Sequence, residues 1–334
     1  MIEAIKNTSA RFEGDGVVSF TTATLDAPAT GLARIRVDVC ALCGSDKRLL
    51  ASGADVVPGH EVVGTVIESV PGAPAAGTRV VVFIPVSCGQ CPACRRQQNN
   101  RCYELRGLMG WQFDGGFAEY MDVPPQCLIP VPDDIPSDVA VLALDTFGTA
   151  AHALRLGART QPDGIEDLLV IGCGPLGLGV VAVALAMGIP KVQAWDPNGS
   201  RLALAQALGA EAAPDLEGTN RHQVVAEVSG AASARASAQD LVEPGGAILA
   251  LGESNEPYLM PATPRWRRTD CFTVRSFYFP PTEVDDNWEL LRSQGARLRD
   301  TIMTPTRLRD LEDTFTRFVA GEYVKPYITH EETR

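Results

Sequence analysis

The sequence is short of basic residues and of the long apolar runs that membrane spans require. It contains 29 Lys and Arg against 41 Asp and Glu in 334 residues, a net charge of −12. A chain this negative has no long-range attraction for phosphate backbones or anionic lipids, which argues against nucleic acid and membrane partners. No run reaches 18 apolar residues, and residues 1–6 lack the charged and apolar regions of a secretory signal. We therefore expect a soluble, cytoplasmic protein.

The sequence also lacks internal repeats, low-complexity tracts and long linkers. Hydrophobic residues make up 45% of the chain and charged residues 21%. Both fractions are ordinary for a globular protein and too apolar for a disordered one. At about 150 residues per domain, the length suggests two domains.

The hydrophobic pattern changes near the middle of the chain. Up to about residue 150, apolar segments separated by Pro and Gly predict a β-rich half. Its predicted strands are 33–39, 61–67 and 79–84. From residue 167 onward, predicted strands alternate with predicted helices, which is typical of parallel βαβ units in a doubly wound sheet. These strands are 168–171, 191–195, 224–228 and 247–251, and the helices are 175–187, 201–208 and 231–242. Two more helices are predicted at 284–294 and 308–319.

The residues that directly follow the predicted strand 168–171 match the G-x-G-x-x-G dinucleotide fingerprint. They read Gly172-Cys173-Gly174-Pro175-Leu176-Gly177. Gly172 permits a tight turn, Gly174 lets the backbone approach a pyrophosphate, and Gly177 allows close packing of helix on strand. The helix that this loop opens would present free N–H groups to the phosphates. Because the motif lies between a strand and a helix, it predicts a dinucleotide-binding site.

An acidic residue at the end of the second predicted strand bears on the choice of cofactor. Asp196 lies 24 positions after Gly172, near the spacing of about 20 expected for a carboxylate on the ribose 2′-hydroxyl. A carboxylate there would repel a 2′-phosphate, which favours NAD over NADP. Arg201 could contact a 2′-phosphate and so weakens this preference.

Four of the nine cysteines fall within fifteen residues. Disulfides rarely persist in the cytosol, so metal binding is the leading explanation for this cluster. The spacing is C-x2-C-x2-C-x7-C, formed by Cys88, Cys91, Cys94 and Cys102. Four thiolates at these separations suit a closed tetrahedral zinc site, which is structural because it leaves no open position.

The four cysteines have two alternative uses. An iron–sulfur cluster also takes four thiolates, although its usual spacings differ. A zinc ribbon that binds nucleic acid would explain the nearby Arg95, Arg96 and Arg101, but the acidic chain argues against it.

A series of further motifs gives the chain a family resemblance. Cys43-Gly44-Ser45-Asp46 and Gly59-His60-Glu61 precede the four cysteines, and residues 114–120 and the fingerprint follow them. This order resembles that of the zinc-dependent medium-chain alcohol and polyol dehydrogenases over nearly the whole chain. The resemblance implies an α/β fold with a GroES-like β-rich catalytic domain and a Rossmann doubly wound parallel-sheet cofactor domain. We expect the catalytic domain at 1–150 and 280–334, with a zinc lobe at about 86–104, and the cofactor domain at 151–279.

The same resemblance implies a second, catalytic zinc held by Cys43, His60 and Asp145. It also implies that Glu61 can approach or enter the metal shell. Asp145 matches the ligand position of bacterial secondary-alcohol and formaldehyde-type relatives, in which a His follows seven residues later, here His152. One thiolate, one imidazole and one carboxylate already leave the open position that catalysis requires, so we expect His152 to have a packing role.

Other site residues follow from the resemblance. Ser45 matches the hydroxyl that relays the substrate proton in relatives. Many relatives carry a His three residues later, where this chain has Arg48, and an arginine does not deprotonate. The proton would then leave by another route, such as water, and Arg48 could lie near a cofactor phosphate. Thr149 matches a position near the nicotinamide. Ser229-Gly230 and Gly252 fall after predicted strands, where the ring and its ribose would pass.

The substrate is the least determined feature. Residues 110–113 resemble the segment that gives bacterial secondary-alcohol dehydrogenases a pocket Trp, so Trp111 and Phe113 would form an apolar wall, although Trp111 could equally be core. The predicted function is hydride transfer between a nicotinamide cofactor and a secondary alcohol, a polyol or the corresponding ketone, in a homodimer or homotetramer. One alternative is a formaldehyde-type aldehyde-processing enzyme of the same fold. Another is a non-catalytic, redox-responsive protein that binds a dinucleotide and zinc.

Overall fold

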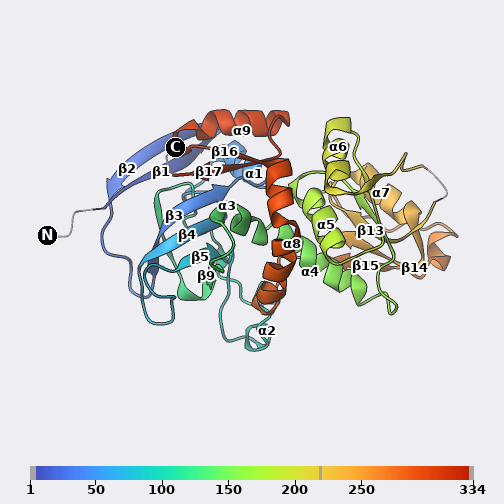
Figure 1. Cartoon of the computed structure of the whole chain (residues 1–334), viewed down its shortest axis with the longest axis horizontal. Helices are drawn as coiled ribbons and strands as arrows, with labels where there is room; N and C mark the ends of the chain where they lie inside the picture. The colour runs from blue at the N-terminus through green and yellow to red at the C-terminus, as the bar shows by residue number, and fades with distance from the viewer. Residues whose placement is uncertain (1–4, 218–219, 331–334) are drawn as a thin grey trace. The chain divides into compact units, whose positions relative to one another are not determined.

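The chain folds into two compact units. The computed structural model describes residues 5–217 and 220–330. One unit comprises Met1–Leu144 together with Ile302–Arg334, and the other comprises Asp145–Thr301 (Figure 1). Residues 1–4, on which the expected lack of a secretory signal partly depends, lie outside the described ranges.

These boundaries differ from the predicted ones at 150 and 280. The helices α4 (Phe147–Ala158) and α8 (Val284–Ile302) account for the difference. Arg155 of α4 donates hydrogen bonds to Glu283, just before α8, at 2.8 Å and to Asn287 of α8 at 2.7 Å. Both helices are therefore tied into the second unit, and the first unit resumes only at residue 302.

A seven-stranded sheet is the main element of the first unit. Its strand order is β16-β17-β3-β4-β5-β9, with β8 also paired to β3. These strands are β3 (Ala33–Ala41), β4 (Glu61–Glu68), β5 (Arg79–Val82), β8 (Tyr120–Val123), β9 (Leu128–Pro130), β16 (Met303–Thr306) and β17 (Lys325–Thr329). The three strands predicted in this half are confirmed to within two residues at each end. Apolar residues of these strands are buried, and Phe315 of α9 (Leu311–Ala320) packs edge-on against Phe12 with ring centroids 5.3 Å apart.

The remaining elements of this unit are a hairpin, a small strand pair and short helices. They include the hairpin of β1 (Lys6–Gly14) and β2 (Val17–Thr24), the small pair β6 (Pro85–Val86) and β7 (Gly107–Leu108), and the helices α1 (Asp46–Ser52), α2 (Pro92–Arg95) and α3 (Ser137–Ala140). The helix predicted at 308–319 is a 3-10 turn at Leu308–Asp310 followed by α9.

The second unit contains a six-stranded sheet in which every described pairing is parallel. Its order is β12-β11-β10-β13-β14-β15, so the direction of winding reverses between β10 and β13. The strands are β10 (Asp167–Ile171), β11 (Lys191–Trp195), β12 (Glu211–Ala212), β13 (His222–Glu227), β14 (Val242–Ala250) and β15 (Phe272–Arg275). This order is that of the Rossmann fold, so the predicted fold class is confirmed.

Helices connect these parallel strands, as the alternating pattern predicts. They are α5 (Pro175–Ala186), α6 (Gly199–Leu208) and α7 (Ala232–Leu241). Helix α6 begins after Asn198, whose side chain accepts the Ser200 N–H at 3.0 Å, and ends at Gly209 with φ = 116°. These are the expected start and stop signals of a helix. Helix α8 continues to residue 302, beyond the predicted end at 294.

One helical stretch is long and apolar enough to cross a membrane by length and composition. It runs from Ser137 to Ala158, and 83% of its most apolar window is buried inside the protein. Burial of this extent is what a core helix of a globular protein shows, so the stretch is weak support for a membrane span.

A charged cluster lies at the amino ends of three neighbouring parallel strands. Asp167 at the start of β10 lies 2.6 Å from His222 Nδ1 at the start of β13 and 2.6 Å from Lys191 Nζ at the start of β11. Burial works to raise the pKa of Asp167, but the hydrogen bonds and charges of His222 and Lys191 outweigh it, so the pKa is lowered.

This cluster predicts a pH-dependent contribution to stability. A carboxyl whose folded-state pKa is depressed stabilises the fold above its unfolded pKa of about 3.9 and stops doing so as pH falls through the folded value. Asp167→Asn should therefore lower the free energy of unfolding at pH 7. The expected loss is about 1 kcal/mol, because a partly exposed ion pair contributes no more than this. In urea unfolding, the difference in free energy of unfolding between variant and wild type should shrink below about pH 4. A difference of equal size at both pH values would contradict this account.

Candidate active site and metal centres

Strand register brings the predicted catalytic ligands together. Strands β3 and β4 pair antiparallel with Ala41 opposite Glu61. Cys43 follows β3 by two residues, and His60 immediately precedes β4, so this pairing places the two side by side. Asp145 directly follows Leu144, the last residue before the chain leaves the first unit. One side-chain ligand atom from each of Cys43, His60, Glu61 and Asp145 lies within 4.8 Å of the others.

A carboxylate that the sequence analysis did not assign orients the imidazole. Asp46 is fully buried, and one of its oxygens accepts the Cys43 N–H at 2.9 Å. Its other oxygen lies 3.0 Å from His60 Nδ1, a close contact whose angles fall outside those of a hydrogen bond. Nδ1 therefore faces Asp46, which leaves Nε2 for a metal, the arrangement common in carboxylate–histidine–zinc sites.

The charge of Asp46 also affects the imidazole. Burial works to lower the pKa of His60, but the neighbouring carboxylate of Asp46 and the side chain of Cys43 outweigh burial, and the pKa is raised well above its ordinary value. The pocket around His60 thus favours positive charge. A divalent cation is one way to supply it.

Glu61 has a buried cationic partner from the other end of the chain. Lys325 of β17 forms an ion pair with Glu61 Oε1, and both side chains are at most 1% exposed. Strand β17 pairs with β3 on the side opposite β4, with Tyr327 facing Ala41. The C-terminal segment therefore completes this site, and no motif in the sequence analysis indicated Lys325.

Close glycine contacts bring a loop against His60. Gly59 has φ = 95°, and a Cβ added there would lie 2.8 Å from the Phe117 nitrogen. A Cβ at Gly110 would lie 2.8 Å from the Gly59 carbonyl carbon, and one at Gly115 would lie 2.2 Å from the Gly59 oxygen. Larger residues would push this loop away. Because the loop lies this close to His60, the centroid of the Trp111 ring is 6.2 Å from the centroid of the His60 ring.

The two predicted pocket residues lie in different places. Trp111 borders the metal cluster through His60, whereas Phe113 lies on the surface of a separate cavity of about 320 Å³ that none of the candidate ligands lines. The Gly110 N–H donates to the Phe113 carbonyl at 2.8 Å, which closes a turn and reverses the chain between the two aromatic residues. Spacing in sequence could not show this reversal.

The two polar residues near Cys43 take different positions. Ser45 is partly buried immediately before α1, between Cys43 and Asp46. Arg48 lies on α1, and its guanidinium carbon is 5.1 Å from the centroid of the Trp111 ring, a cation–π contact. Arg48 therefore borders the same pocket wall as Trp111.

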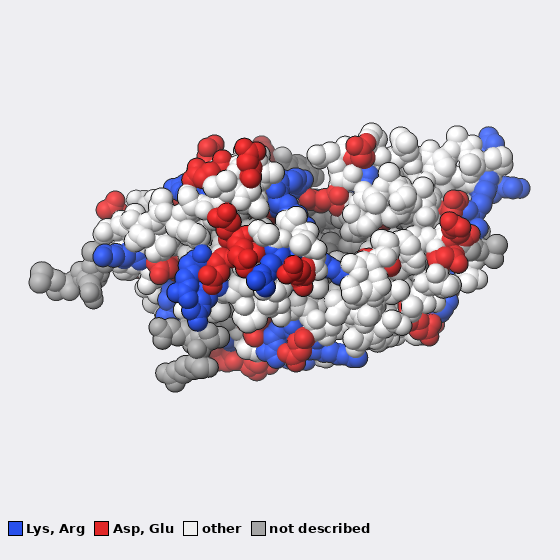
Figure 2. All heavy atoms as spheres, turned by 90° about the horizontal axis from the view of Figure 1, so that it is seen from above, with Lys and Arg blue, Asp and Glu red and all other residues white. Residues whose placement is uncertain are grey.

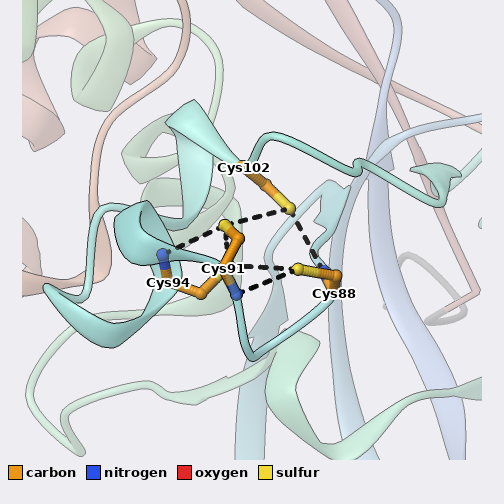
Figure 3. A group of neighbouring side chains, drawn as sticks. All are labelled: Cys88, Cys91, Cys94 and Cys102. Atoms are coloured by element: carbon orange, nitrogen blue, oxygen red, sulfur yellow. Dashed lines mark hydrogen bonds between the residues drawn. The ribbon is translucent and has the colours of Figure 1, made fainter.

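The four clustered cysteines converge as a second metal centre (Figure 3). Cys91 Sγ lies 3.5 Å from Cys94 Sγ and 4.0 Å from Cys102 Sγ, and Cys88 Sγ lies 4.0 Å from Cys94 Sγ. Tetrahedral zinc with Zn–S bonds of about 2.3 Å requires sulfur separations of about 3.8 Å. The donor set therefore fits a zinc ion.

The backbone around this lobe stabilises thiolates. Cys91 caps α2, and the N–H groups of Tyr103 and Cys94 each point at its sulfur at 3.5 Å. These contacts lower the pKa of Cys91 to about 6, whereas burial and the neighbouring Cys91 raise the pKa of Cys94 to about 11. Among the described residues, the lobe's own buried apolar cluster consists of Ala93 and these cysteines. Such a lobe depends on a metal for its order.

In the second unit, the fingerprint forms the expected cradle. Gly172 has φ = 101° after β10, Pro175 is the first residue of α5, and a Cβ at Gly177 would lie 1.8 Å from the Gly172 oxygen. Only glycine fits at Gly177. The loop's Cys173 N–H donates to Asp196 at 2.7 Å, so the acidic residue at the end of β11 is held beside the fingerprint.

The other predicted cofactor residues lie in the same unit. Arg201 is on α6, five residues after Asp196. The hydroxyl of Thr149 on α4 lies 3.4 Å from Asp145 Oδ1, which links this residue to a candidate metal ligand. A Cβ at Gly252 would lie 2.0 Å from the Gly230 nitrogen, so only glycine fits where the segments after β13 and β14 meet.

His152, which we expect to pack rather than bind metal, is buried beside Glu283. Its Nδ1 lies 2.9 Å from Glu283, which also accepts from Arg155 at 2.8 Å. Burial works to raise the pKa of Glu283, but His152 and Arg155 lower it overall. His152 is absent from the metal-binding groups found among the described residues.

The fold and these sites together define the class of protein: an oxidoreductase with a metal-binding GroES-like unit and a dinucleotide-binding Rossmann unit. The family model for the alcohol dehydrogenase GroES-like domain matches residues 29–133. An L-threonine 3-dehydrogenase of Coxiella burnetii is 34% identical over 247 residues, which cover 67% of this chain and 70% of that relative. The chain belongs to the zinc-type medium-chain dehydrogenase/reductase family.

Solved structures agree with this assignment. The alcohol dehydrogenase of Thermus sp. ATN1 has a TM-score of 0.87 and 26% identity, covering 97% of this chain and 100% of the other. At 23% identity, two more share the fold: an alcohol dehydrogenase of Escherichia coli CFT073 complexed with NADH, and a protein of Sinorhizobium meliloti described as a zinc-binding dehydrogenase, bound to NADP. Their TM-scores are 0.83 and 0.85, and each alignment covers 97% of this chain and 99% of the other.

The contact between Asp46 and His60 predicts a selective effect on metal affinity. Asp46→Asn removes the charge that faces His60, and loss of such an outer partner typically weakens zinc binding about 10- to 100-fold. Chelator competition should show this loss for one zinc per chain. Zinc in the cysteine lobe, measured in the same sample, serves as the internal control. If the variant retained both zinc ions as tightly as wild type does, the role assigned to Asp46 would be contradicted.

Proposed function

We propose that the protein catalyses reversible hydride transfer between a small secondary alcohol or polyol and a nicotinamide dinucleotide. The observation that carries this proposal is the convergence of Cys43, His60, Glu61 and Asp145 within 4.8 Å. A shell of one thiolate, one imidazole and one carboxylate leaves a position open for substrate, as catalytic zinc sites do. The Rossmann cradle in the second unit supports a dinucleotide as the hydride carrier.

Cys43, His60 and Asp145 would hold the catalytic zinc, and the four lobe cysteines a structural one. A zinc ion at the open site would act as a Lewis acid, which favours loss of the hydroxyl proton and, in the reverse direction, polarises the carbonyl. Lys325 keeps Glu61 paired beside this shell. Asp46 holds the His60 ring with Nε2 available.

The chain's own residues would then handle the proton. Ser45, two positions after Cys43, accepts the substrate proton and passes it outward. Arg48 cannot take the proton, because a guanidinium stays charged in proteins. Its contact with the Trp111 ring supports a role in holding the pocket wall, and the proton leaves through water.

We favour NAD as the cofactor. Asp196 is held beside the fingerprint by the Cys173 N–H at 2.7 Å and by the Asn198 N–H at 2.8 Å. A fixed carboxylate suits a ribose 2′-hydroxyl and repels a 2′-phosphate. Arg201 remains the one nearby predicted residue that would favour NADP.

The substrate class rests on Trp111. Its ring beside His60 supports an apolar wall for a modest alcohol or ketone. A 3-hydroxy amino acid is a second candidate, because the matched relatives include L-threonine 3-dehydrogenases. A formaldehyde-type aldehyde reaction has only the Asp145 pattern in its favour. A non-catalytic, redox-responsive role has no observation of its own, since the complete ligand set argues for an open metal site.

We also propose a cytoplasmic location and a homodimer or homotetramer. None of the nine cysteines forms a disulfide within residues 5–217 and 220–330. On the face drawn in Figure 2, acidic and basic side chains are interspersed rather than gathered into one basic surface. The family resemblance is the basis for the oligomeric state.

The function is tested by a screen of secondary alcohols, polyols and L-threonine with NAD, followed by absorbance of the reduced cofactor. Wild type should turn over at least one neutral secondary alcohol or polyol. Preference for L-threonine over every neutral substrate would select the second candidate. No turnover of any class, despite bound zinc, would favour the non-catalytic role.

Two cysteine variants should separate the metal sites. Cys43→Ala removes a ligand of the open site and should lower turnover by about 10³-fold or more, because zinc supplies several kcal/mol in such sites. The fold should stay intact. Cys91→Ala, the matched control, should lower the melting temperature because the lobe loses its zinc. Wild-type rates for Cys43→Ala would remove the catalytic assignment.

The cofactor preference is tested at Asp196. Asp196→Ser removes the carboxylate that would repel a 2′-phosphate, so kcat/KM for NADP relative to NAD should rise by about tenfold or more, the equivalent of about 1.4 kcal/mol. Wild type that already uses NADP more efficiently than NAD would overturn the preference.

A further inference from the structure

A buried carboxylate with no assigned role lies at the carboxyl edge of the parallel sheet. Glu227 is the last residue of β13 and is fully buried. Burying an ionised carboxylate is costly unless hydrogen bonds and a partner charge compensate. Glu227 Oε1 accepts three hydrogen bonds, from the Ser229 N–H at 2.8 Å, the Ser229 hydroxyl at 2.7 Å and the Gly230 N–H at 2.8 Å. The carboxylate thus fixes the turn that follows its own strand.

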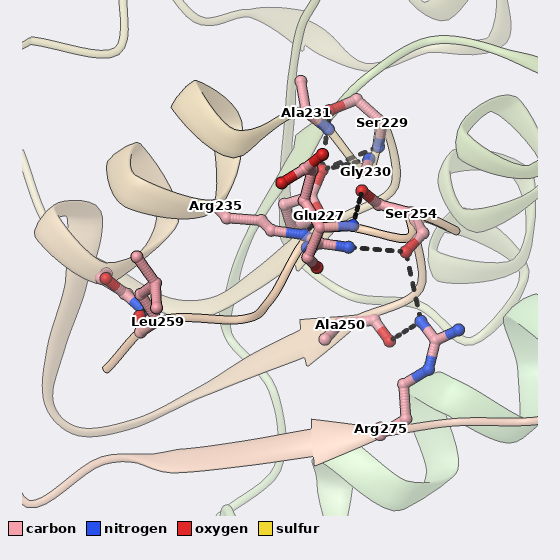
Figure 4. A network of polar contacts seen from close by, with 12 residues as sticks. Glu227, Ser229, Gly230, Ala231, Arg235, Ala250, Ser254, Leu259 and Arg275 are labelled. Atoms are coloured by element: carbon pink, nitrogen blue, oxygen red, sulfur yellow. Dashed lines mark hydrogen bonds and ion pairs between the residues drawn. The ribbon is translucent and has the colours of Figure 1, made fainter. Parts of the chain in front are cut away.

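A cation faces the other carboxylate oxygen. Glu227 Oε2 lies 3.8 Å from Nε of Arg235 on α7 (Figure 4). The Arg235 guanidinium also donates to the carbonyls of Glu256 at 2.9 Å and Gly252 at 3.5 Å. The Glu227 carbonyl in turn accepts the Gly252 N–H at 3.0 Å. The Glu227–Arg235 pair therefore ties the segment after β13 to the segment after β14.

A second arginine strengthens the same junction. Arg275 of β15 donates to the carbonyls of Ala250 at 2.9 Å and Gly252 at 3.3 Å. The segment after β13 also reaches the dinucleotide fingerprint, because a Cβ at Gly172 would lie 3.1 Å from the Ser229 nitrogen. The network thus lies at the junction of β10 and β13, where the winding of the sheet reverses and ligands bind in open α/β folds.

We propose that Glu227 and Arg235 form a positioning pair for the dinucleotide site. The inference rests on the proposed function. Neither residue is assigned contact with the cofactor. Together they hold residues 229–230 and 252–256 in place before the cofactor arrives. Segments that are already ordered lose little freedom on binding, so the pair raises cofactor affinity.

The proposal predicts an effect on cofactor binding that a merely structural role would not produce. Glu227→Ala removes hydrogen bonds to a charged acceptor and should weaken NADH binding by about tenfold or more. Glu227→Gln should weaken it by about threefold, because an amide accepts on one side only and must turn its NH2 group toward either Arg235 or the Ser229–Gly230 donors. The KM for NAD should rise, while kcat at saturating NAD stays within about twofold.

The measurements are NADH fluorescence titration and amide hydrogen exchange at Ser229 and Gly230. Both amides should exchange faster in Glu227→Gln than in wild type. Asp167→Asn is the matched control, because it breaks an ion pair at the opposite, amino-terminal edge of the same sheet. It should leave NADH affinity and exchange at both amides unchanged.

Each outcome bears on the proposal. Wild-type NADH affinity in Glu227→Gln overturns it, whether or not exchange at the two amides changes. Equal loss of affinity in the Asp167→Asn control overturns it as well, because the effect is then one of general stability. If Glu227→Ala fails to fold, Glu227→Gln and Arg235→Met decide the question by the same titration. If wild type binds neither NADH nor NADPH, the proposed function itself fails.

Discussion

The pairing of β3 with β4 is the constraint on which the metal site depends. Because Ala41 lies opposite Glu61, the chain leaving β3 passes Cys43 beside His60 at the start of β4. The same β3 strand pairs with β17 on its other side, which brings Lys325 to Glu61. The register is fixed by apolar residues: Val62 and Val66 of β4 are buried in the core. A slip of one residue would move these side chains to the other face of the sheet, so the hydrophobic core helps to set the geometry of the ligands.

The balance of charge at the site favours a bound cation. Cys43 as thiolate, Asp46, Glu61 and Asp145 would carry four negative charges, and Lys325 supplies one positive charge. Asp46 and Glu61 are fully buried, where uncompensated charge is costly. A divalent cation on Cys43, His60 and Asp145 would offset most of the remainder. The cysteine lobe follows a similar rule, since its four converging sulfurs have little apolar core around them.

The fold was predictable because its signals are local. Alternating strands and helices, the fingerprint between β10 and α5, and the short cysteine spacing each lie within one stretch of chain. Asp46, Lys325 and Glu227 were missed for a physical reason: their partners are set by register or by turns. Lys325 meets Glu61 across 264 positions of sequence. Asp46 belongs to the motif Cys43-Gly44-Ser45-Asp46. Its position three residues after Cys43, at the start of a helix, was the one sequence feature that could have indicated its contact with the site. Phe113 was predicted as a pocket residue because sequence adjacency to Trp111 conceals the turn between them.

The central claim is that the chain holds an open metal site as well as a closed one. Diffraction data collected on both sides of the zinc absorption edge test this directly, because the anomalous difference locates zinc without reference to activity. The account predicts two peaks per chain, one among the four lobe cysteines and one between Cys43, His60 and Asp145, with non-protein density at its fourth position. A single peak in the lobe, or a second peak closed by four protein ligands, would contradict it.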